Sequence, residues 1–286
     1  MEFIKNMALQ LQTCRSLSEF STFGIGGPIR YFVEVATIEE MDEVFRLDFP
    51  KLIIGKGSNC LFSDQGFSGL VILNKIDFCN WNGGEVTAGS GYSFSLLGVQ
   101  TARKGLSGLE FASGIPATVG GAVFMNAGAN GSETSKSVKS VLFFDGCRHR
   151  EYLRSEIAFG YRSSPFQKMG GVILSATFSL TPSEEARKSQ LEIIDYRIKT
   201  QPLKEKSIGC IFRNPQGVSA GALIDRCGLK GASVGSAKVS EIHANFIVNR
   251  GNASAEEVKQ LIRLVQEKVL EQTGVCLEPE IRMIDA

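Results

Sequence analysis

Glycine is the residue that most constrains this chain, because it is concentrated in a few segments of the first half. The sequence has 286 residues and 31 glycines, about 11% against a usual ~7%. Residues 105–131 hold seven glycines, and further clusters lie at 23–28 and 53–73. Glycine loses the most backbone freedom on folding, so each cluster needs a reason. Either tight turns join short strands, or the backbone approaches a large ligand with N–H groups directed at phosphates. Three clusters favour the ligand.

The common nucleotide-binding signatures are absent. Gly55-x-Gly57 is followed by Cys60 where the dinucleotide fingerprint requires glycine, and GxxxxGK[ST] occurs nowhere. We therefore expect a phosphate cradle of another kind.

The composition is that of an ordinary soluble protein. Hydrophobic residues make up 43%, and 31 basic against 30 acidic residues give no field for binding polyanions or membranes. Seven cysteines without a CxxC pair, and only two histidines, argue against a zinc site and for a reducing compartment. The opening MEFIKNMALQLQ lacks the apolar stretch of a signal peptide, and no apolar run approaches a membrane span. These features predict a cytosolic, soluble protein with about two packing units.

Periodicity and capping residues predict mixed helices and strands, an α+β fold. Thr37 and Glu40 form a capping box that begins a helix over 38–46, and Ser254 and Glu257 begin another over 254–272 that ends at Gly274. A third helix is expected over 93–104, ending at Gly105. Strands are expected at 51–54, 70–73, 85–89, 138–144 and 172–180, with a loop at 55–69.

Two segments give more specific expectations. Val172, Leu174, Ala176, Phe178 and Leu180 alternate with smaller or polar residues, which predicts a half-buried strand. Pro182 and the polar residues after it mark a boundary. The next helix is expected to bury a face through Leu191, Ile194 and Ile198.

A hydrolase motif also occurs. Gly217-Val-Ser219-Ala-Gly221 matches G-x-S-x-G, and Asp225 and His243 follow in the order of a catalytic triad. A nucleophile elbow, however, requires a strand that leads directly into the serine turn, and residues 214–216 intervene. Ser219 is better explained as the N-cap of a helix over 220–228.

Taken together, the glycine clusters and later motifs resemble the UDP-N-acetylenolpyruvoylglucosamine reductases, flavoenzymes of bacterial cell-wall (peptidoglycan) precursor synthesis. The resemblance spans about residues 20–284. The matching stretches are STFGIGG (21–27), IGKGSNCLFSDQGFSGLVI (54–72), GLEFASGIPATVGGAVFMNAGANG (108–131), FGYRSSPF (159–166), GCIFRNP (209–215), AGALIDRCGLKG (220–231), HANFIVN (243–249) and LEPEIRMI (277–284).

The resemblance implies a fold and a reaction. The fold would be a two-subdomain FAD-binding module of the vanillyl-alcohol-oxidase (PCMH) type, residues 1–75 and 76–185, followed by a substrate-binding domain, 186–286. NADPH would reduce FAD, which passes hydride to the enolpyruvyl group of UDP-N-acetylglucosamine enolpyruvate to give UDP-N-acetylmuramate. No nucleic acid, membrane or metal is expected. The compact final region implies the class without an inserted tyrosine-bearing loop.

The same resemblance implies catalytic residues. Arg162 and Glu280 would face the carboxylate end of the substrate, where hydride transfer leaves negative charge. Glu280 could help there only when protonated or through a donor, so a raised pKa is expected. The family usually has serine where this chain has Cys210, a stronger acid than a hydroxyl group and therefore the expected proton donor.

The remaining site residues are also implied by the resemblance. Cys60 lies in the cofactor loop, and although FAD is expected to be non-covalent, sequence does not exclude a bond to this thiol. The expected FAD-binding residues are Gly55, Lys56, Gly57, Ser58, Asn59, Cys60, Gly114, Ile115, Pro116, Ala117, Thr118, Gly120, Gly121, Asn126, Ala127 and Gly128. The expected substrate-binding residues are Tyr161, Arg213, Asn214, Lys238 and Asn245.

Two alternatives stay open at this level. One is an FAD oxidoreductase of the same scaffold that acts on another alcohol or acid, against which Arg162, Cys210 and Glu280 argue together. The other is a nucleotide-sugar-binding protein that has lost turnover.

Overall fold

The protein is described by a computed structural model, which covers residues 10–285. The opening on which the signal-peptide expectation rests, residues 1–9, lies outside the described residues. The chain divides into two compact units. Unit 1 comprises residues 10–11, Phe32–Gly55 and Val71–Tyr196, and unit 2 comprises Gln12–Tyr31, Lys56–Leu70 and residues 197–285. The expected three-part division at residues 75 and 185 stays a prediction.

Three elements carry the chain from one unit to the other. They are strand β2 (Pro28–Val35), strand β5 (Phe67–Asn74) and helix α4 (Ala186–Thr200). The two strands are neighbours in a four-stranded sheet of order β1-β2-β5-β3, with β1 at Arg15–Ser16 and β3 at Lys51–Ile54. Helix α1 (Ile38–Phe45) follows β2 and begins with the predicted capping box of Thr37 and Glu40.

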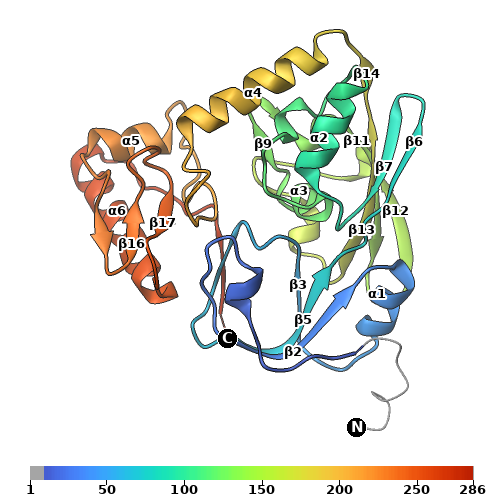
Figure 1. Cartoon of the computed structure of the whole chain (residues 1–286), viewed down its shortest axis with the longest axis horizontal. Helices are drawn as coiled ribbons and strands as arrows, with labels where there is room; N and C mark the ends of the chain where they lie inside the picture. Colours follow the sequence, from blue (N-terminus) through green and yellow to red (C-terminus); the bar gives the residue numbers. More distant parts are fainter. Residues whose placement is uncertain (1–9, 286) are drawn as a thin grey trace. The chain divides into compact units, whose positions relative to one another are not determined.

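Unit 1 is built on a five-stranded antiparallel sheet of order β12-β11-β13-β7-β6 (Figure 1). Helices α2 (Phe94–Arg103) and α3 (Val119–Met125) pack on this sheet and share its hydrophobic core. The Phe94 ring on α2, for example, lies 6.4 Å from the Phe178 ring on β13. The strands are β6 (Cys79–Asn82), β7 (Glu85–Gly89), β11 (Val138–Phe144), β12 (His149–Leu153) and β13 (Val172–Ser179). Short pairs are formed by β8 (Leu106–Ser107) with β14 (Thr181–Pro182) and by β9 (Gly128–Ala129) with β10 (Ser132–Glu133).

Most local predictions in unit 1 are confirmed. Strands β3, β7 and β11 have the predicted bounds. Helix α2 ends at Arg103, one residue earlier than predicted, and Gly105 has the left-handed conformation that a helix terminus favours.

The prediction of a half-buried strand over 172–180 is confirmed in its second half and wrong in its first. Ala176, Phe178 and Leu180 belong to the core cluster as expected. Residues 172–176, however, are all buried, and the cluster contains Ile173 rather than Val172 and Leu174. The cause is a shift in pairing with β11 between Leu142 and Phe143, a bulge that adds one residue to β13. An inserted residue reverses the side-chain alternation, so a strict period of two assigns the wrong face.

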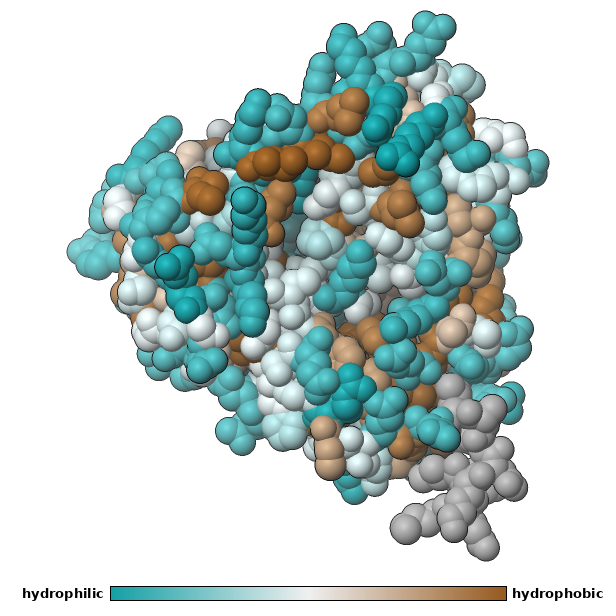
Figure 2. All heavy atoms as spheres, in the orientation of Figure 1, coloured by the Kyte–Doolittle hydropathy of each residue, from teal (hydrophilic) through white to brown (hydrophobic). Residues whose placement is uncertain are grey.

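The predicted apolar face of α4 is also wrong, although the helix lies where it was expected. Leu191 is 49% and Ile198 63% exposed, whereas Gln190 is fully buried and Arg197 nearly so. Figure 2 shows hydrophobic side chains along the surface where Figure 1 draws α4. Ile194, the third residue of the expected face, is half-buried. The buried positions 190 and 197 are polar, which hydrophobic periodicity cannot reveal.

Unit 2 is centred on a three-stranded antiparallel sheet and two helices. The strands are β15 (Ser233–Val234), β16 (Ala237–Val239) and β17 (Ile247–Asn249), and the helices are α5 (Ala220–Arg226) and α6 (Ala255–Thr273). Helix α6 confirms its prediction: it has the Ser254–Glu257 capping box, ends at Gly274 and buries Val258, Leu261, Ile262, Val265 and Val269. The core of this unit also contains Phe23, Ile25 and Leu61 from its two early segments.

Strand β4 (Cys60–Phe62) was missed by the sequence analysis, which expected a loop at 55–69. It pairs in parallel with β18 (Arg282–Ile284), more than 200 residues away, and Ser63 N–H donates to the Ile284 carbonyl (2.9 Å). Three residues give no periodicity of their own, so only the partner at the far end of the chain defines this strand.

The described part of the chain has neither a membrane-spanning helix nor a cluster of metal-binding side chains. No helix within residues 10–285 is long and apolar enough to cross a membrane. Over the same range, the histidine, cysteine and carboxylate side chains form no group of three that could hold a metal ion, and no disulfide is present.

Replacing the N-cap of α6, Ser254→Ala, is expected to lower the free energy of unfolding by about 1 kcal/mol. The Ser254 hydroxyl accepts a hydrogen bond from Glu257 N–H (3.1 Å), which would lose its partner. Chemical denaturation followed by circular dichroism measures the change. Ser68→Ala, at an exposed serine that caps no helix, is the matched control. Equal stability of Ser254→Ala and the unmodified protein would contradict the assigned cap.

Candidate active site

The expected cofactor segments of unit 1 meet at Gly55, the residue after β3. A Cβ atom at Gly55 would lie 2.5 Å from Thr118 Oγ1, so only glycine permits this approach. Gly120 is equally confined, because its Cβ atom would lie 2.9 Å from the Cβ atom of Ser90. These two glycines therefore serve close packing between parts of the protein.

Gly121 differs, because its surroundings leave room for a side chain. It is an exposed residue within α3, and its Cβ atom would meet only Thr118 Oγ1, at 3.4 Å. Glycine destabilises a helix by about 1 kcal/mol relative to alanine. Space left open beside a helical glycine is what close approach by a flat ligand requires, so this surface of α3 fits the expected cofactor.

The side chain of Asn126 is occupied by protein contacts. It is fully buried at the C-terminal end of α3, with φ +44°. Its Nδ2 donates to the Gly160 carbonyl (2.9 Å), and its Oδ1 accepts from Ser135 N–H (2.9 Å). If Asn126 binds the cofactor as predicted, it must do so through its backbone.

In unit 2 the cofactor loop packs on two other family motifs. A Cβ atom at Gly57 would lie 2.0 Å from the Phe20 carbonyl, and the Gly57 carbonyl accepts from Thr22 N–H (3.4 Å). At the other end, the Asn59 carbonyl accepts from Arg282 N–H (2.9 Å). The loop is therefore fixed by residues near both ends of the chain.

Arg162 sits in a tight turn of unit 1 with an unusual backbone. Gly160 and Ser163 exchange two backbone hydrogen bonds, of 3.0 and 3.1 Å, which close the turn around Tyr161 and Arg162. Arg162 has φ +52°, at the turn position that usually requires glycine. Its Nη2 donates to the Gly128 carbonyl (2.8 Å). Strained residues persist only where their surroundings fix them, and such residues cluster at functional sites.

Cys210 and Glu280 are brought to neighbouring backbone segments of unit 2. Glu280 N–H donates to the carbonyl of Ile211 (2.7 Å), the residue after Cys210, and the backbones of Phe212 and Pro279 form an isolated antiparallel β-bridge. On the other side of the segment, the backbones of Cys210 and Phe246 form a second β-bridge. The segment with Cys210 therefore lies between the HANFIVN and LEPEIRMI motifs. Arg162 belongs to unit 1.

Asn245 fixes the Cys210 segment instead of offering its side chain to a ligand. Its Oδ1 accepts from Phe212 N–H (2.9 Å), and its Nδ2 donates to the Phe212 carbonyl (2.8 Å). Asn245 is buried, and its own carbonyl accepts from Ile211 N–H (2.8 Å). The amide thus acts like a strand neighbour, a role that differs from the predicted substrate contact.

The other expected substrate residues have varied surroundings. Asn214 Oδ1 accepts from Ala220 N–H at the start of α5 (3.0 Å), and Lys238 forms an ion pair with Glu241 (2.9 Å). Tyr161 is about half exposed beside the Arg162 guanidinium. Arg213 carries a buried Nε with no acceptor among the described residues.

Sequence analysis missed Arg197, on the buried side of α4. Burial lowers the pKa of its guanidinium, an effect opposed by electrostatic interaction with the Cys210 thiol. Arg197 thus places positive charge near the expected proton donor. The sequence offered one indication: Arg197 follows Gln190 by two helical turns, so both side chains lie on the same side of the helix, away from Leu191 and Ile198.

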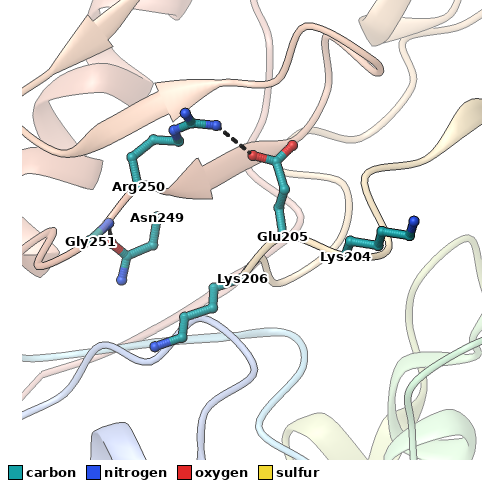
Figure 3. Close-up of a pocket in the computed structure, with 6 residues that line it drawn as sticks. All are labelled: Lys204, Glu205, Lys206, Asn249, Arg250 and Gly251. Atoms are coloured by element: carbon teal, nitrogen blue, oxygen red, sulfur yellow. Dashed lines mark hydrogen bonds and ion pairs between the residues drawn. The ribbon is translucent and has the colours of Figure 1, made fainter.

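A basic depression in unit 2 was also missed (Figure 3). Lys204, Lys206 and Arg250 line it together with Glu205, which pairs with Arg250 (3.2 Å). Its charge favours anions. The neutral balance of the whole chain concealed this local excess.

The residues of the hydrolase motif do not form a triad. Ser219 caps α5, as expected, and its hydroxyl accepts from Ala222 N–H (3.4 Å). Asp225 pairs with Lys230 (2.8 Å), and His243 Nδ1 accepts from Asn245 N–H (3.2 Å).

Two family models match the chain. An FAD-binding domain model matches residues 29–146, and the model of the C-terminal domain of UDP-N-acetylenolpyruvoylglucosamine reductase matches residues 201–284. These matches confirm the expected FAD binding and fold class.

Curated proteins and a solved structure agree with these models. The chain is 56% identical to the UDP-N-acetylenolpyruvoylglucosamine reductase of Protochlamydia amoebophila (96% of this chain, 94% of the relative). It is 52% identical to that of Chlamydia muridarum (94% and 92%). The crystal structure of the Thermus caldophilus reductase superposes with a TM-score of 0.85 at 39% identity, covering 96% of this chain and 99% of the other. The chain therefore belongs to the UDP-N-acetylenolpyruvoylglucosamine reductase family, a family of FAD-binding oxidoreductases.

Proposed function

We propose that this protein uses NADPH to reduce UDP-N-acetylglucosamine enolpyruvate to UDP-N-acetylmuramate for cell-wall precursor synthesis, with Cys210 as the proton donor. The observation that carries the proposal is the backbone pairing that holds Cys210 next to Glu280, because it joins two motifs that are 70 residues apart in the chain.

FAD would be held by the backbone of two glycine-rich segments. The open face at Gly121 supports this assignment, and the packing of Gly55 on Thr118 brings the two segments together. When bound, FAD supplies the hydride that it receives from NADPH. The protein's residues must then manage the charge and the proton on the substrate.

Arg162 would stabilise the negative charge that hydride addition leaves next to the substrate carboxylate. A guanidinium stays protonated and presents its donors in a fixed plane, which suits two carboxylate oxygens. The turn that holds Arg162 limits its freedom before substrate binds, so less entropy is lost on binding. Glu280 would act at the same end of the substrate, as a neutral acid or through a donor.

Cys210 would donate the proton to the α-carbon. An ordinary thiol is mostly protonated at neutral pH and is more acidic than serine. Donation leaves a thiolate, and the positive charge of Arg197 interacts favourably with negative charge on that sulfur. Arg197 thus supports a donor that is a thiol instead of the usual hydroxyl group.

The nucleotide part of the substrate would bind to unit 2. The buried Nε of Arg213 is a donor that a ligand oxygen could satisfy, since an unsatisfied buried donor destabilises the protein by about 1–3 kcal/mol. Lys238 would contribute charge to the diphosphate after exchanging its pairing with Glu241.

The proposed function is tested by the visible spectrum of the purified protein during a sequential anaerobic titration. We expect flavin bands that bleach on NADPH addition, less readily with NADH, and return when UDP-N-acetylglucosamine enolpyruvate is added. A colourless protein would favour the binding-only alternative. Bleaching without recovery would favour an FAD oxidoreductase with another substrate.

Cys210→Ala is expected to leave FAD reduction by NADPH intact but to slow flavin reoxidation by substrate by roughly 10²–10⁴-fold, the usual contribution of a general acid. Stopped-flow absorbance measures each half-reaction. Cys210→Ser should keep much of the activity, since it retains a donor. Cys276→Ala, at an exposed cysteine, is the control. Equal losses in both half-reactions of Cys210→Ala would remove Cys210 from the donor role.

The Cys60 thiol is expected to react slowly with alkylating reagents, which supports non-covalent FAD. Burial raises the pKa of Cys60 to about 11, although the charge of Arg282 opposes this. Only the thiolate is nucleophilic, so at pH 8 Cys60 should react about 100-fold more slowly than a cysteine of ordinary pKa and gain rate as the pH rises to 11. Timed iodoacetamide labelling with peptide mass spectrometry compares it with exposed Cys14, Cys147 and Cys276. Labelling of Cys60 at the rate of those three cysteines would contradict the raised pKa of its thiol.

A further inference from the structure

The turn that carries Arg162 is held by side chains from two other segments of unit 1. Asn126 Nδ2 donates to the Gly160 carbonyl at the start of the turn (2.9 Å). Gln167 Nε2 donates to the Arg162 carbonyl itself (3.2 Å) and to the Phe124 carbonyl near the end of α3 (2.9 Å). Both ends of the turn are therefore tied to the same helix end.

Asn126 is well suited to this task. Its left-handed backbone ends α3, and asparagine tolerates that conformation better than most residues. Its amide is completely buried, and its second contact, with Ser135 N–H, fixes the orientation of the group. The Asn126 side chain can therefore hold only one position.

The guanidinium of Arg162 is fixed from the same region. Its Nη2 donates to the carbonyl of Gly128, two residues after Asn126. A Cβ atom at Gly128 would lie 3.0 Å from Arg162 Nη1 and 2.6 Å from the Ser132 carbonyl, so the position is restricted to glycine. One short segment, 126–128, thus contacts Arg162 at both its backbone turn and its side chain.

We propose that Asn126, together with Gln167, is a positioning residue for Arg162: it holds the arginine in a left-handed turn so that the guanidinium has a preset place before substrate binds. This inference rests on the proposed role of Arg162. Neither amide group contacts substrate in the proposed reaction. Their effect passes through the arginine, since a small displacement of a charged catalytic group is enough to slow a reaction.

The test is a double-mutant cycle that combines Asn126→Gly with Arg162→Ala. Glycine keeps the left-handed backbone and removes both amide hydrogen bonds. In otherwise unmodified protein, we expect Asn126→Gly to slow flavin reoxidation by UDP-N-acetylglucosamine enolpyruvate roughly 10- to 100-fold, mainly through kcat. In the Arg162→Ala background the same change should alter the rate by less than about 3-fold, because the arginine it positions is gone.

Asn130→Gly is the matched control, since Asn130 is also a left-handed asparagine but lies exposed four residues away. The control should leave kcat, the flavin spectrum and FAD reduction by NADPH unchanged. Asn126→Gly should also preserve the flavin spectrum and FAD reduction by NADPH. These two measurements report on cofactor binding separately from substrate reduction.

Two results would overturn the inference. An equal loss from Asn126→Gly with and without Arg162 would show a merely structural role. An Arg162→Ala variant with full activity would remove the proposed function of Arg162, and positioning with it. If Asn126→Gly loses FAD, Gln167→Met replaces it in the same cycle, because it removes the donor to the Arg162 carbonyl with little change in volume and no added charge.

Discussion

The short backbone segment from Cys210 to Arg213 is the part on which the rest of unit 2 depends. It is paired on one side with residues 245–246 and on the other with residues 278–280. Without these bonds, its peptide groups would be buried without partners, and the two motifs would have no common reference. A thiol and a carboxyl group from distant parts of the chain thereby acquire a fixed relation to one backbone.

Unit 1 follows the same principle with a different device. Its sheet and two helices form an ordinary core, and Arg162, the proposed catalytic residue, lies outside it on a turn that is unfavourable for arginine. Hydrogen bonds from side chains compensate for that local strain. In both units asparagine amides imitate backbone groups, Asn126 for the turn and Asn245 for the strand.

Local physics predicted the regular elements well. Capping boxes placed α1 and α6, and strands β7 and β11 have the predicted bounds, because these signals depend only on neighbouring residues. The failures depend on distant partners. The bulge in β13 is set by its pairing with β11, β4 exists only through β18, and the buried polar side of α4 has no hydrophobic signature. For the site, the motifs indicated where to look, but not that the amides of Asn126 and Asn245 are used within the protein, and not that Arg197 interacts with Cys210.

The interleaved course of the chain also affects how the protein folds during synthesis. Phe23, Ile25 and Leu61 are made early, yet their core partners lie between residues 208 and 281, and β4 waits for the strand at 282–284. The second core therefore cannot close until the ribosome has released almost the whole polypeptide. Until then these apolar side chains lack their core partners, and transiently exposed apolar surface of this kind promotes aggregation.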